Sequence, residues 1–335
     1  MALVGKKIGH SPVRSFLTGT RSNDVILNVL TNEASKYQIF QRTLCTSSVK
    51  NNSTPGSQVS SKQSLDAVFV FTPTETHADY ICESLRRGKA VMTEKPCGET
   101  YSDIKRCYDL AERMDKVLLT GFQRRFDTTF QDVFQASRNK ALGDLRFMRV
   151  TSRDSPKPPY EFLRNTDVSG CSLISDMAVH DIDMTVWLTC AERPISVYTM
   201  SHMHDPIMKE ISQPDSSLLA LKYESGLMVI IDSERESPYG YDMRIEMFGS
   251  EGMVKAENPR ESSAVVDGKD GGKLKRLFNS FPQRFEAAFE KEIDHFIDCL
   301  DGRDTPLIKK EECLLTMEVV EKGVESFKTG KVVYL

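Results

Sequence analysis

The 335-residue chain lacks the features that mark several broad classes of protein. Its 44 basic and 48 acidic residues leave a net charge of only −4, so electrostatics give no reason to expect a nucleic acid or an anionic membrane as a partner. The longest apolar runs, such as residues 65–71, fall far short of the ~20 residues that a membrane span needs. Residues 1–5 have the pattern of a strand entering a turn rather than that of a secretory signal. We therefore expect no nucleic acid and no membrane, and a cytoplasmic location by default.

Metal and redox motifs are missing too. Eight cysteines are scattered along the chain and none forms a C-x-x-C pair, so neither a zinc ribbon nor a dithiol redox motif is indicated. We expect free thiols and no metal site.

The glycine pattern of a dinucleotide-binding fold is incomplete. Gly5 and Gly9 match the first and last glycines of G-x-G-x-x-G, but the middle glycine is absent and the loop is about one residue short. An acidic residue for the ribose is normally found ~20 positions further on, and here Glu33 is the nearest one. The residues in this region therefore set no firm preference between NAD and NADP.

Strand and helix patterns alternate through the first part of the chain. Residues 66–71 form an almost continuous apolar run, which favours a parallel strand buried on both faces. The same rhythm continues with a helix at 78–87, a strand at 90–93, a helix at 101–114 and a strand at 116–120. This predicts an open parallel sheet of the Rossmann type. Residues 41–64 interrupt the rhythm with a polar loop, so that 1–64 is a degenerate part of this domain.

The pattern changes after residue 122. Strands with period-two alternation are predicted at 145–153, 195–202, 217–223, 226–233 and 244–249. Amphipathic helices are predicted at 281–300 and 311–327. We expect an α/β protein of two domains: a dinucleotide-binding domain at 1–122, and an α+β domain at 123–335 with a largely antiparallel, open-faced sheet that binds substrate and mediates assembly.

Two candidate site segments follow predicted parallel strands. Thr72, Pro73 and His77 come just after the first strand, and Glu94 and Lys95 come just after the next. Ligands in open α/β sheets lie beyond the carboxyl ends of the strands, so both segments suit a cofactor. Lysine offers an ammonium donor and a tunable pKa, which suit electrostatic and acid–base work. A plain helix cap at the first segment and a surface turn at the second are the alternatives.

A third segment combines acid and imidazole. Asp176 and His180 are four residues apart, so on a helix they share a face, and a carboxylate beside an imidazole can orient it as a general base. Asp183 is placed to reach the same site, where it could accept hydrogen bonds from sugar hydroxyls. An ordinary surface ion pair and a metal site built from these three residues are the alternatives.

These segments, together with 121–127, 152–154 and 239–242, resemble the Gfo/Idh/MocA oxidoreductase family, and most closely its inositol 2-dehydrogenase branch. The resemblance covers residues 65–335 and is much poorer over 1–64. It implies that Lys95 is the catalytic lysine of a Glu-Lys-Pro motif, that Asp176 and His180 form the acid–base pair, and that Arg124, Tyr239 and Tyr241 touch substrate.

The resemblance also implies the partners of the chain. They are a polyol or sugar substrate, NAD or NADP with NAD slightly favoured, no metal, and a homo-oligomer (a dimer or tetramer) assembled through the open sheet face. The expected activity is hydride transfer between nicotinamide and a secondary alcohol of a cyclic polyol or sugar. A pseudoenzyme with an impaired cofactor loop, acting as a binding or regulatory protein, is the alternative, and a different ring alcohol or an open aldose is a third hypothesis.

Overall fold

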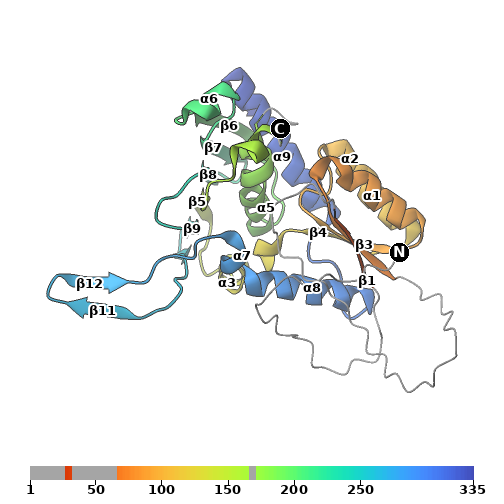
Figure 1. Ribbon diagram of the computed structural model, residues 1–335, viewed down its shortest axis with the longest axis horizontal. Coiled ribbons are helices and arrows are strands. Elements are labelled where there is room, and N and C mark those ends of the chain that lie inside the picture. The colour runs from red at the N-terminus through yellow and green to blue at the C-terminus, as the bar shows by residue number, and fades with distance from the viewer. Residues whose placement is uncertain (1–26, 32–65, 166–170) are drawn as a thin grey trace, which may run out of the picture.

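The first sheet of the protein consists only of parallel strands. The computed structural model describes residues 27–31, 66–165 and 171–335, and Figure 1 shows their arrangement. Four strands pair in the order β1-β2-β3-β4, with bounds β1 Leu27–Thr31, β2 Ala67–Phe71, β3 Ala90–Glu94 and β4 Leu118–Gly121. The expectation of an open parallel sheet is confirmed for the described strands. The glycine loop with Gly5 and Gly9, the predicted strand at 1–5 and the polar segment 41–64 lie outside the described residues.

Helices pack on both faces of this sheet. Helices α1 Thr74–Arg86 and α2 Tyr101–Met114 pack together beside the strands. Helix α8 Glu286–Leu300 returns from the far end of the chain, and its Phe296 ring meets Phe69 of β2 edge-on at 5.5 Å. This double coverage explains the continuous apolar sequence of β2, whose first four side chains are all buried.

The second sheet is larger and mostly antiparallel. Its seven strands pair in the order β10-β9-β5-β8-β7-β6-β13, and only β5 and β8 run parallel. The bounds are β5 Leu145–Arg153, β6 Pro194–His202, β7 Ser216–Tyr223, β8 Met228–Glu234, β9 Asp242–Gly249, β10 Met253–Ala256 and β13 Val333–Tyr334.

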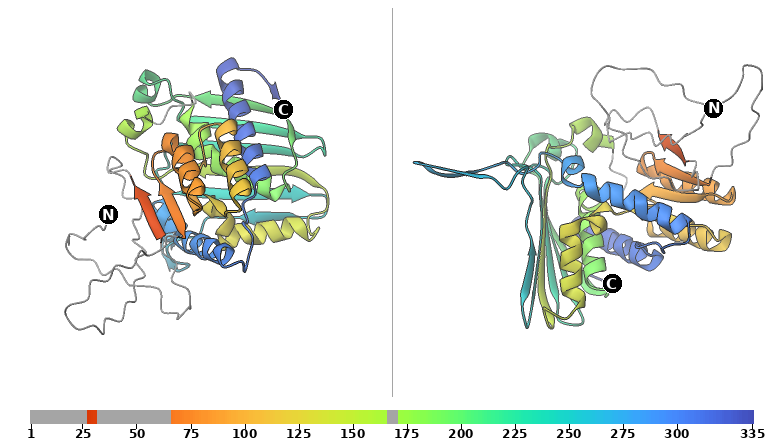
Figure 2. Two further views of the ribbon diagram at one scale, coloured as in Figure 1. Left: turned by 90° about the vertical axis from the view of Figure 1, so that its right-hand side faces the viewer. Right: turned by 90° about the horizontal axis from the view of Figure 1, so that it is seen from below.

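One face of the second sheet carries helices and the other is bare (Figure 2, right). Helices α5 Val179–Leu188 and α9 Lys310–Thr329 pack on the covered face and on each other. Because side chains alternate along a strand, Val150, Leu219 and Ile231 are buried there, while Met200 and Phe248 remain exposed. The remaining helical segments are η1 Gln123–Phe126, α3 Thr128–Arg138, α4 Tyr160–Asn165, the π-helical turn η2 Leu173–Ala178, α6 Pro206–Glu210 and α7 Phe281–Arg284.

A two-stranded hairpin projects from the body of the molecule. Strands β11 Val265–Gly268 and β12 Gly271–Leu274 pair only with each other, and all their residues are exposed. The hairpin extends beyond the bare side of the second sheet (Figure 2, right). No pattern in the sequence predicted this hairpin.

The largest differences from the predicted helices concern α1 and the helix at 281–300, while α9 begins one residue earlier and ends two residues later than predicted. Helix α1 begins at Thr74 instead of residue 78, because Pro73 takes the extended N-cap conformation and its carbonyl accepts from the N–H of Thr76. The helix predicted at 281–300 is broken at Phe285, whose ring is buried against Phe130 and Tyr241. Packing of one aromatic ring thus overrides the local helical pattern. None of the described helices combines the length and apolarity that crossing a membrane requires.

Candidate active site

The ends of β2, β3 and β4 meet at one edge of the first sheet. His77, at the start of α1, is 1% exposed, and its Nδ1 and Nε2 lie 2.8 and 2.7 Å from the carbonyl oxygens of Pro96 and Thr72. The ring therefore ties the turn after β2 to the turn after β3. Because both ring nitrogens face backbone carbonyl oxygens, the structure gives the His77 side chain a role in holding these turns, and its predicted contact with the cofactor stays a prediction.

Gly121 lets β4 approach the end of β3 closely. A Cβ atom at this position would come within 3.0 Å of the Thr93 carbonyl oxygen and 3.4 Å of Glu94 Cα. Burial raises the pKa of the neighbouring Glu94 carboxyl, despite the opposing effect of Lys95. The edge that carries Glu94 and Lys95 is thus tightly packed and partly buried.

Lys95 reaches across to the π-helical turn η2. Its Nζ donates to the Asp176 carbonyl oxygen at 2.6 Å and to Asp176 Oδ1 at 3.1 Å. The lysine side chain is 14% exposed, so the ammonium group is fixed by two bonds in a largely buried position. π-Helical turns are rare and are frequently found at functional sites.

Asp176 binds a second cation. Its Oδ2 accepts from Arg235 Nη1 at 3.2 Å. Burial alone would raise the pKa of Asp176, but Lys95 and Arg235 together outweigh burial and lower it to about 2. The carboxylate is therefore ionised at every physiological pH.

His180, in the first turn of α5, lies in the same cluster as a neutral base. Burial lowers the pKa of its imidazole well below the usual 6.5, and the charges of Lys95 and Arg124 add to this effect. Its Nδ1 is buried and has no hydrogen-bond partner among the described residues. A buried nitrogen without a partner is costly, which favours a ligand group at this position.

The predicted pairing of Asp176 with His180 is not formed in the structure. Both carboxylate oxygens of Asp176 bind cations instead. Residues 173–178 form a π-helical turn, so the four-residue spacing does not place the two side chains as an ordinary α-helix would. The structure brings Asp176 and His180 into one cluster with Lys95, and Lys95 is the group that Asp176 orients.

Asp154 follows β5 and faces the same cluster. Its Oδ2 lies 3.9 Å from Arg235 Nη1. Burial raises the pKa of Asp154 to about 6, against the lowering effect of Arg235. This carboxyl group therefore changes charge close to neutral pH.

Arg124 and Tyr241 form a buried wall beside His180. The Arg124 guanidinium donates to Asp181 and hydrogen-bonds to Tyr241, and both residues are at most 5% exposed. They were predicted to touch substrate, and the structure shows them bound to each other. Tyr239 is 49% exposed, with its hydroxyl donating to Asp242 at 2.6 Å, and it lines an open pocket of about 1000 Å³.

Asp183 lies away from the site, contrary to its predicted role. It is fully buried, and its two carboxylate oxygens accept from Arg125 Nε and Nη2 at 2.9 and 2.6 Å. Arg125 also donates to Glu312 of α9 at 2.7 Å. The three-residue spacing from His180 turns Asp183 toward η1 and α9, so we assign it to the packing of these elements and not to substrate binding.

Arg235 and Asp154 were not recognised from the sequence as members of the site. Asp154 belongs to the segment 152–154 that was noted for its resemblance, but nothing assigned it a role. Arg235 follows β8 without any motif, and the parallel pairing of β5 with β8 brings it beside Asp154. Among the described residues, no cluster of His, Cys, Asp and Glu side chains could hold a metal ion.

The ends of a parallel sheet are where nucleotides bind, and a lysine held on an aspartate beside a neutral histidine supplies acid–base groups there, which suits a nicotinamide-dependent oxidoreductase. Two family models match the chain: the oxidoreductase family with NAD-binding Rossmann fold over residues 1–122, and the GFO/IDH/MocA C-terminal domain over 130–255. The first match includes the glycine-poor opening of the chain.

Individual relatives agree with the family models. The chain is 31% identical over 270 residues to myo-inositol 2-dehydrogenase of Thermotoga maritima, covering 80% of each chain. It is 35% identical over 238 residues to inositol 2-dehydrogenase of Rhizobium meliloti, covering 71% of each. The structure of scyllo-inositol dehydrogenase from Lactobacillus casei with bound NAD(H) and scyllo-inositol superposes with a TM-score of 0.74 at 25% identity, covering 82% of this chain and 81% of that one. The chain belongs to the Gfo/Idh/MocA family of NAD-binding oxidoreductases.

Proposed function

We propose that the protein is a dehydrogenase of cyclic polyols that oxidises a secondary alcohol of an inositol-like ring. The observation that carries this proposal is the cluster in which Lys95 is fixed on Asp176 beside a neutral His180. The inositol dehydrogenases among its relatives support the choice of a ring polyol over an open aldose.

Lys95 and His180 have separate roles in the oxidation of the alcohol. The Lys95 ammonium group donates to the reacting hydroxyl oxygen and stabilises the negative charge that develops there. The imidazole of His180, kept neutral by burial, accepts the hydroxyl proton as a general base. Asp176 holds the lysine in place, and the largely buried position of the cluster strengthens each of these electrostatic interactions.

The edge of the first sheet suits a nicotinamide nucleotide. Thr72 and Pro73 follow β2, Glu94 lies at the end of β3, and Gly121 lets the end of β4 pack closely against Glu94. We propose that Thr72, Pro73, Glu94 and Lys95 hold the nucleotide, together with Gly5 and Gly9. When bound, NAD supplies the acceptor for the hydride.

Nucleotide binding separates the dehydrogenase from a pseudoenzyme. We expect NADH to raise the melting temperature of the purified protein, because a ligand at a hundred times its Kd adds about 2.7 kcal/mol to stability. NADPH serves as the comparison that tests the preference for NAD. The absence of a shift with both nucleotides at millimolar concentration would favour the pseudoenzyme.

The substrate is identified by rates at 340 nm. We expect NAD reduction with myo- or scyllo-inositol and slower reduction with aldoses. Turnover of an aldose with higher kcat/KM than every inositol tested would replace the polyol assignment while leaving the dehydrogenase assignment intact.

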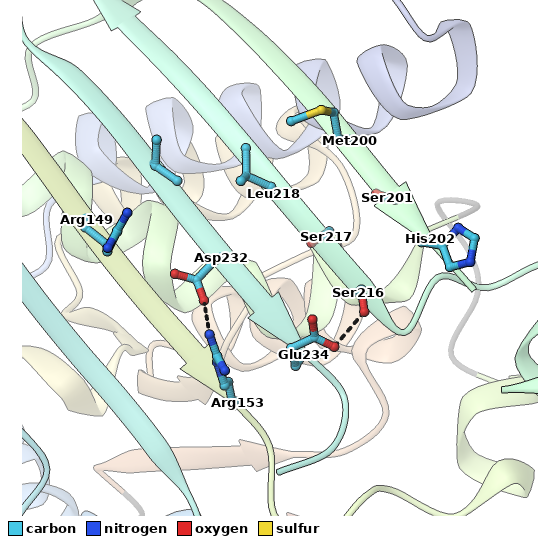
Figure 3. A pocket seen from close by; sticks show the side chains of 11 residues that line it. Arg149, Arg153, Met200, Ser201, His202, Ser216, Ser217, Leu218, Asp232 and Glu234 are labelled. Carbon is cyan, nitrogen blue, oxygen red and sulfur yellow. Dashed lines mark hydrogen bonds and ion pairs between the residues drawn. The ribbon is translucent and has the colours of Figure 1, made fainter. Parts of the chain in front are cut away.

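We also propose that the bare face of the second sheet joins copies of this chain into a dimer or tetramer. A shallow groove of about 550 Å³ runs over this face. Met200, Leu218 and His202 project from it, beside the Arg153–Asp232 ion pair (Figure 3). Exposed methionines on a sheet face are typical of protein interfaces, and the hairpin formed by β11 and β12 projects toward the same side (Figure 2).

A charge placed on this face tests the assembly. We expect the wild-type protein to sediment as a dimer or tetramer and Met200→Glu to sediment as a monomer, because the added carboxylate would be buried without a partner. Met114→Glu, on the exposed surface of α2, is the matched control and should leave the oligomer intact. A monomeric wild-type protein would contradict the proposal.

A further inference from the structure

We infer that Arg235 is a positioning residue that holds the Asp176 carboxylate in place and through it fixes the Lys95 ammonium group. The inference rests on the proposed function, since it concerns the groups that act on the alcohol. It adds a residue outside the recognised motifs, contributed by the end of β8.

Arg235 is well placed for this role because it is itself held firmly. It is 1% exposed and is among the largest fully buried side chains of the described residues. Its Nη1 donates to Asp176 Oδ2 and its Nη2 donates to Ser172 Oγ, both at 3.2 Å. Ser172 in turn is bound through its N–H and its hydroxyl to Gln213 Oε1.

The contacts form a continuous chain from the second sheet to the reacting groups. The guanidinium binds both Ser172, the residue just before the π-helical turn, and Asp176 within the turn. Asp176 then holds Lys95 through its carboxylate and its carbonyl oxygen. A lysine has a long flexible stem, so its ammonium group is only as well placed as the acceptors that hold it.

Arg235 also sets the charge balance of the cluster. Three charged groups at strand ends surround Asp176. They are Lys95 after β3, Arg235 after β8 and Asp154 after β5. The other charged or titratable groups around these residues are Glu94, Arg124, His180, Tyr241 and His77. Burial raises the pKa of both Asp176 and Asp154, while Lys95 and Arg235 lower it. Removal of Arg235 leaves Lys95 in place and should therefore move both pKa values upward only in part.

Three variants separate the position of Arg235 from its charge. For Arg235→Gln we expect kcat for inositol oxidation to fall about 100-fold, since misplacement of a reacting group by an ångström can have an effect of that size. The acidic limb of its pH profile, where kcat falls as the pH is lowered, should also move to higher pH. Arg235→Lys keeps the positive charge but cannot bind Asp176 and Ser172 at the same time. We therefore expect kcat to fall less than in Arg235→Gln, and the acidic limb of the pH profile to stay in place. Ser172→Ala removes the Nη2 contact and the hydroxyl bond to Gln213 but leaves the Arg235–Asp176 pair intact, so kcat should change less than about threefold.

A carboxyl titration tests the same inference without activity. The aspartates are labelled with ¹³C at Cγ, and the Asp176 resonance is identified by its loss in Asp176→Asn. We expect no titration step for Asp176 above pH 4 in the wild-type protein and in Ser172→Ala, and a midpoint displaced to higher pH in Arg235→Gln, where Lys95 is, among the described residues, the one remaining cation on Asp176.

The outcomes for the inference and for the proposed function are distinct. A wild-type protein that oxidises no polyol would refute the proposed function, and the titration would still decide the role of Arg235. If Arg235→Gln lowers only the stability, while its kcat, acidic limb and Asp176 titration match the wild type, Arg235 is merely structural and the inference is overturned. If Arg235→Gln fails to fold, Arg235→Lys decides: unchanged kcat in that variant overturns the inference.

Discussion

Lys95→Met is expected to lower kcat for polyol oxidation by about 10²–10³-fold, the range observed when one donor to a developing oxyanion is removed. Methionine keeps most of the length and apolar bulk of the lysine stem but loses the ammonium group that Asp176 holds. The fold should survive, because Asp176 keeps Arg235 as a partner. Initial rates at 340 nm, at saturating nucleotide, measure the effect.

The matched control for this variant is Lys105→Met on α2. Lys105 is 53% exposed and pairs with Asp109 four residues along the same helix, so its loss should leave kcat unchanged. Circular dichroism melts of both variants monitor the fold. A Lys95→Met protein that turns over at the wild-type rate would remove the central residue of the proposed site.

Arg125→Met is expected to reduce the free energy of unfolding by about 3–5 kcal/mol, the range for breaking a buried ion pair by removing one partner. Arg125 has a fully buried side chain and neutralises both Asp183 and Glu312, and their charges raise its pKa further above its usual range. Its loss leaves Asp183, whose side chain is 1% exposed, without a cation. Urea unfolding followed by circular dichroism and by the fluorescence of Trp187, the single tryptophan, measures the change.

Two further variants make this prediction specific. Arg193 pairs with another glutamate of α9, Glu318, but is 52% exposed, so Arg193→Met should cost no more than about 1 kcal/mol. Adding Asp183→Leu to Arg125→Met removes the stranded carboxylate and should recover part of the loss. Equal stability changes for Arg125→Met and Arg193→Met would contradict the buried-pair explanation.

Local pattern was sufficient to predict the regular elements that span one layer of the fold. Helix α2 and strand β5 have the predicted bounds, 101–114 and 145–153, because each shows one hydrophobic periodicity from end to end. The break at Phe285 and the early start of α1 depend on tertiary packing and on a proline cap, which periodicity does not report. The hairpin β11–β12 has no buried face, so it carries no hydrophobic alternation by which it could be recognised.

The site was predicted in part for a similar reason. Lys95, Asp176 and His180 lie in segments with a recognisable sequence, and the structure gathers them in one cluster. The partner of each acid could not be predicted, because it depends on which distant cation the fold brings near. The spacing of Asp183 from His180 suggested that Asp183 reaches the substrate. In the structure Asp183 instead binds Arg125 of η1, which also binds Glu312 of α9.

The parallel pairing of β5 with β8 affects how the protein acquires its activity during folding. Thr151 of β5 bonds to Asp232 of β8 across 81 residues of chain, and Asp154 and Arg235 lie just beyond these strands. Contacts between segments so far apart in sequence form slowly, because a long loop must close before the contacts stabilise it. Both strands must therefore have left the ribosome before the cluster can assemble. A nascent chain that ends before β8 lacks Arg235, the residue that holds Asp176 in place.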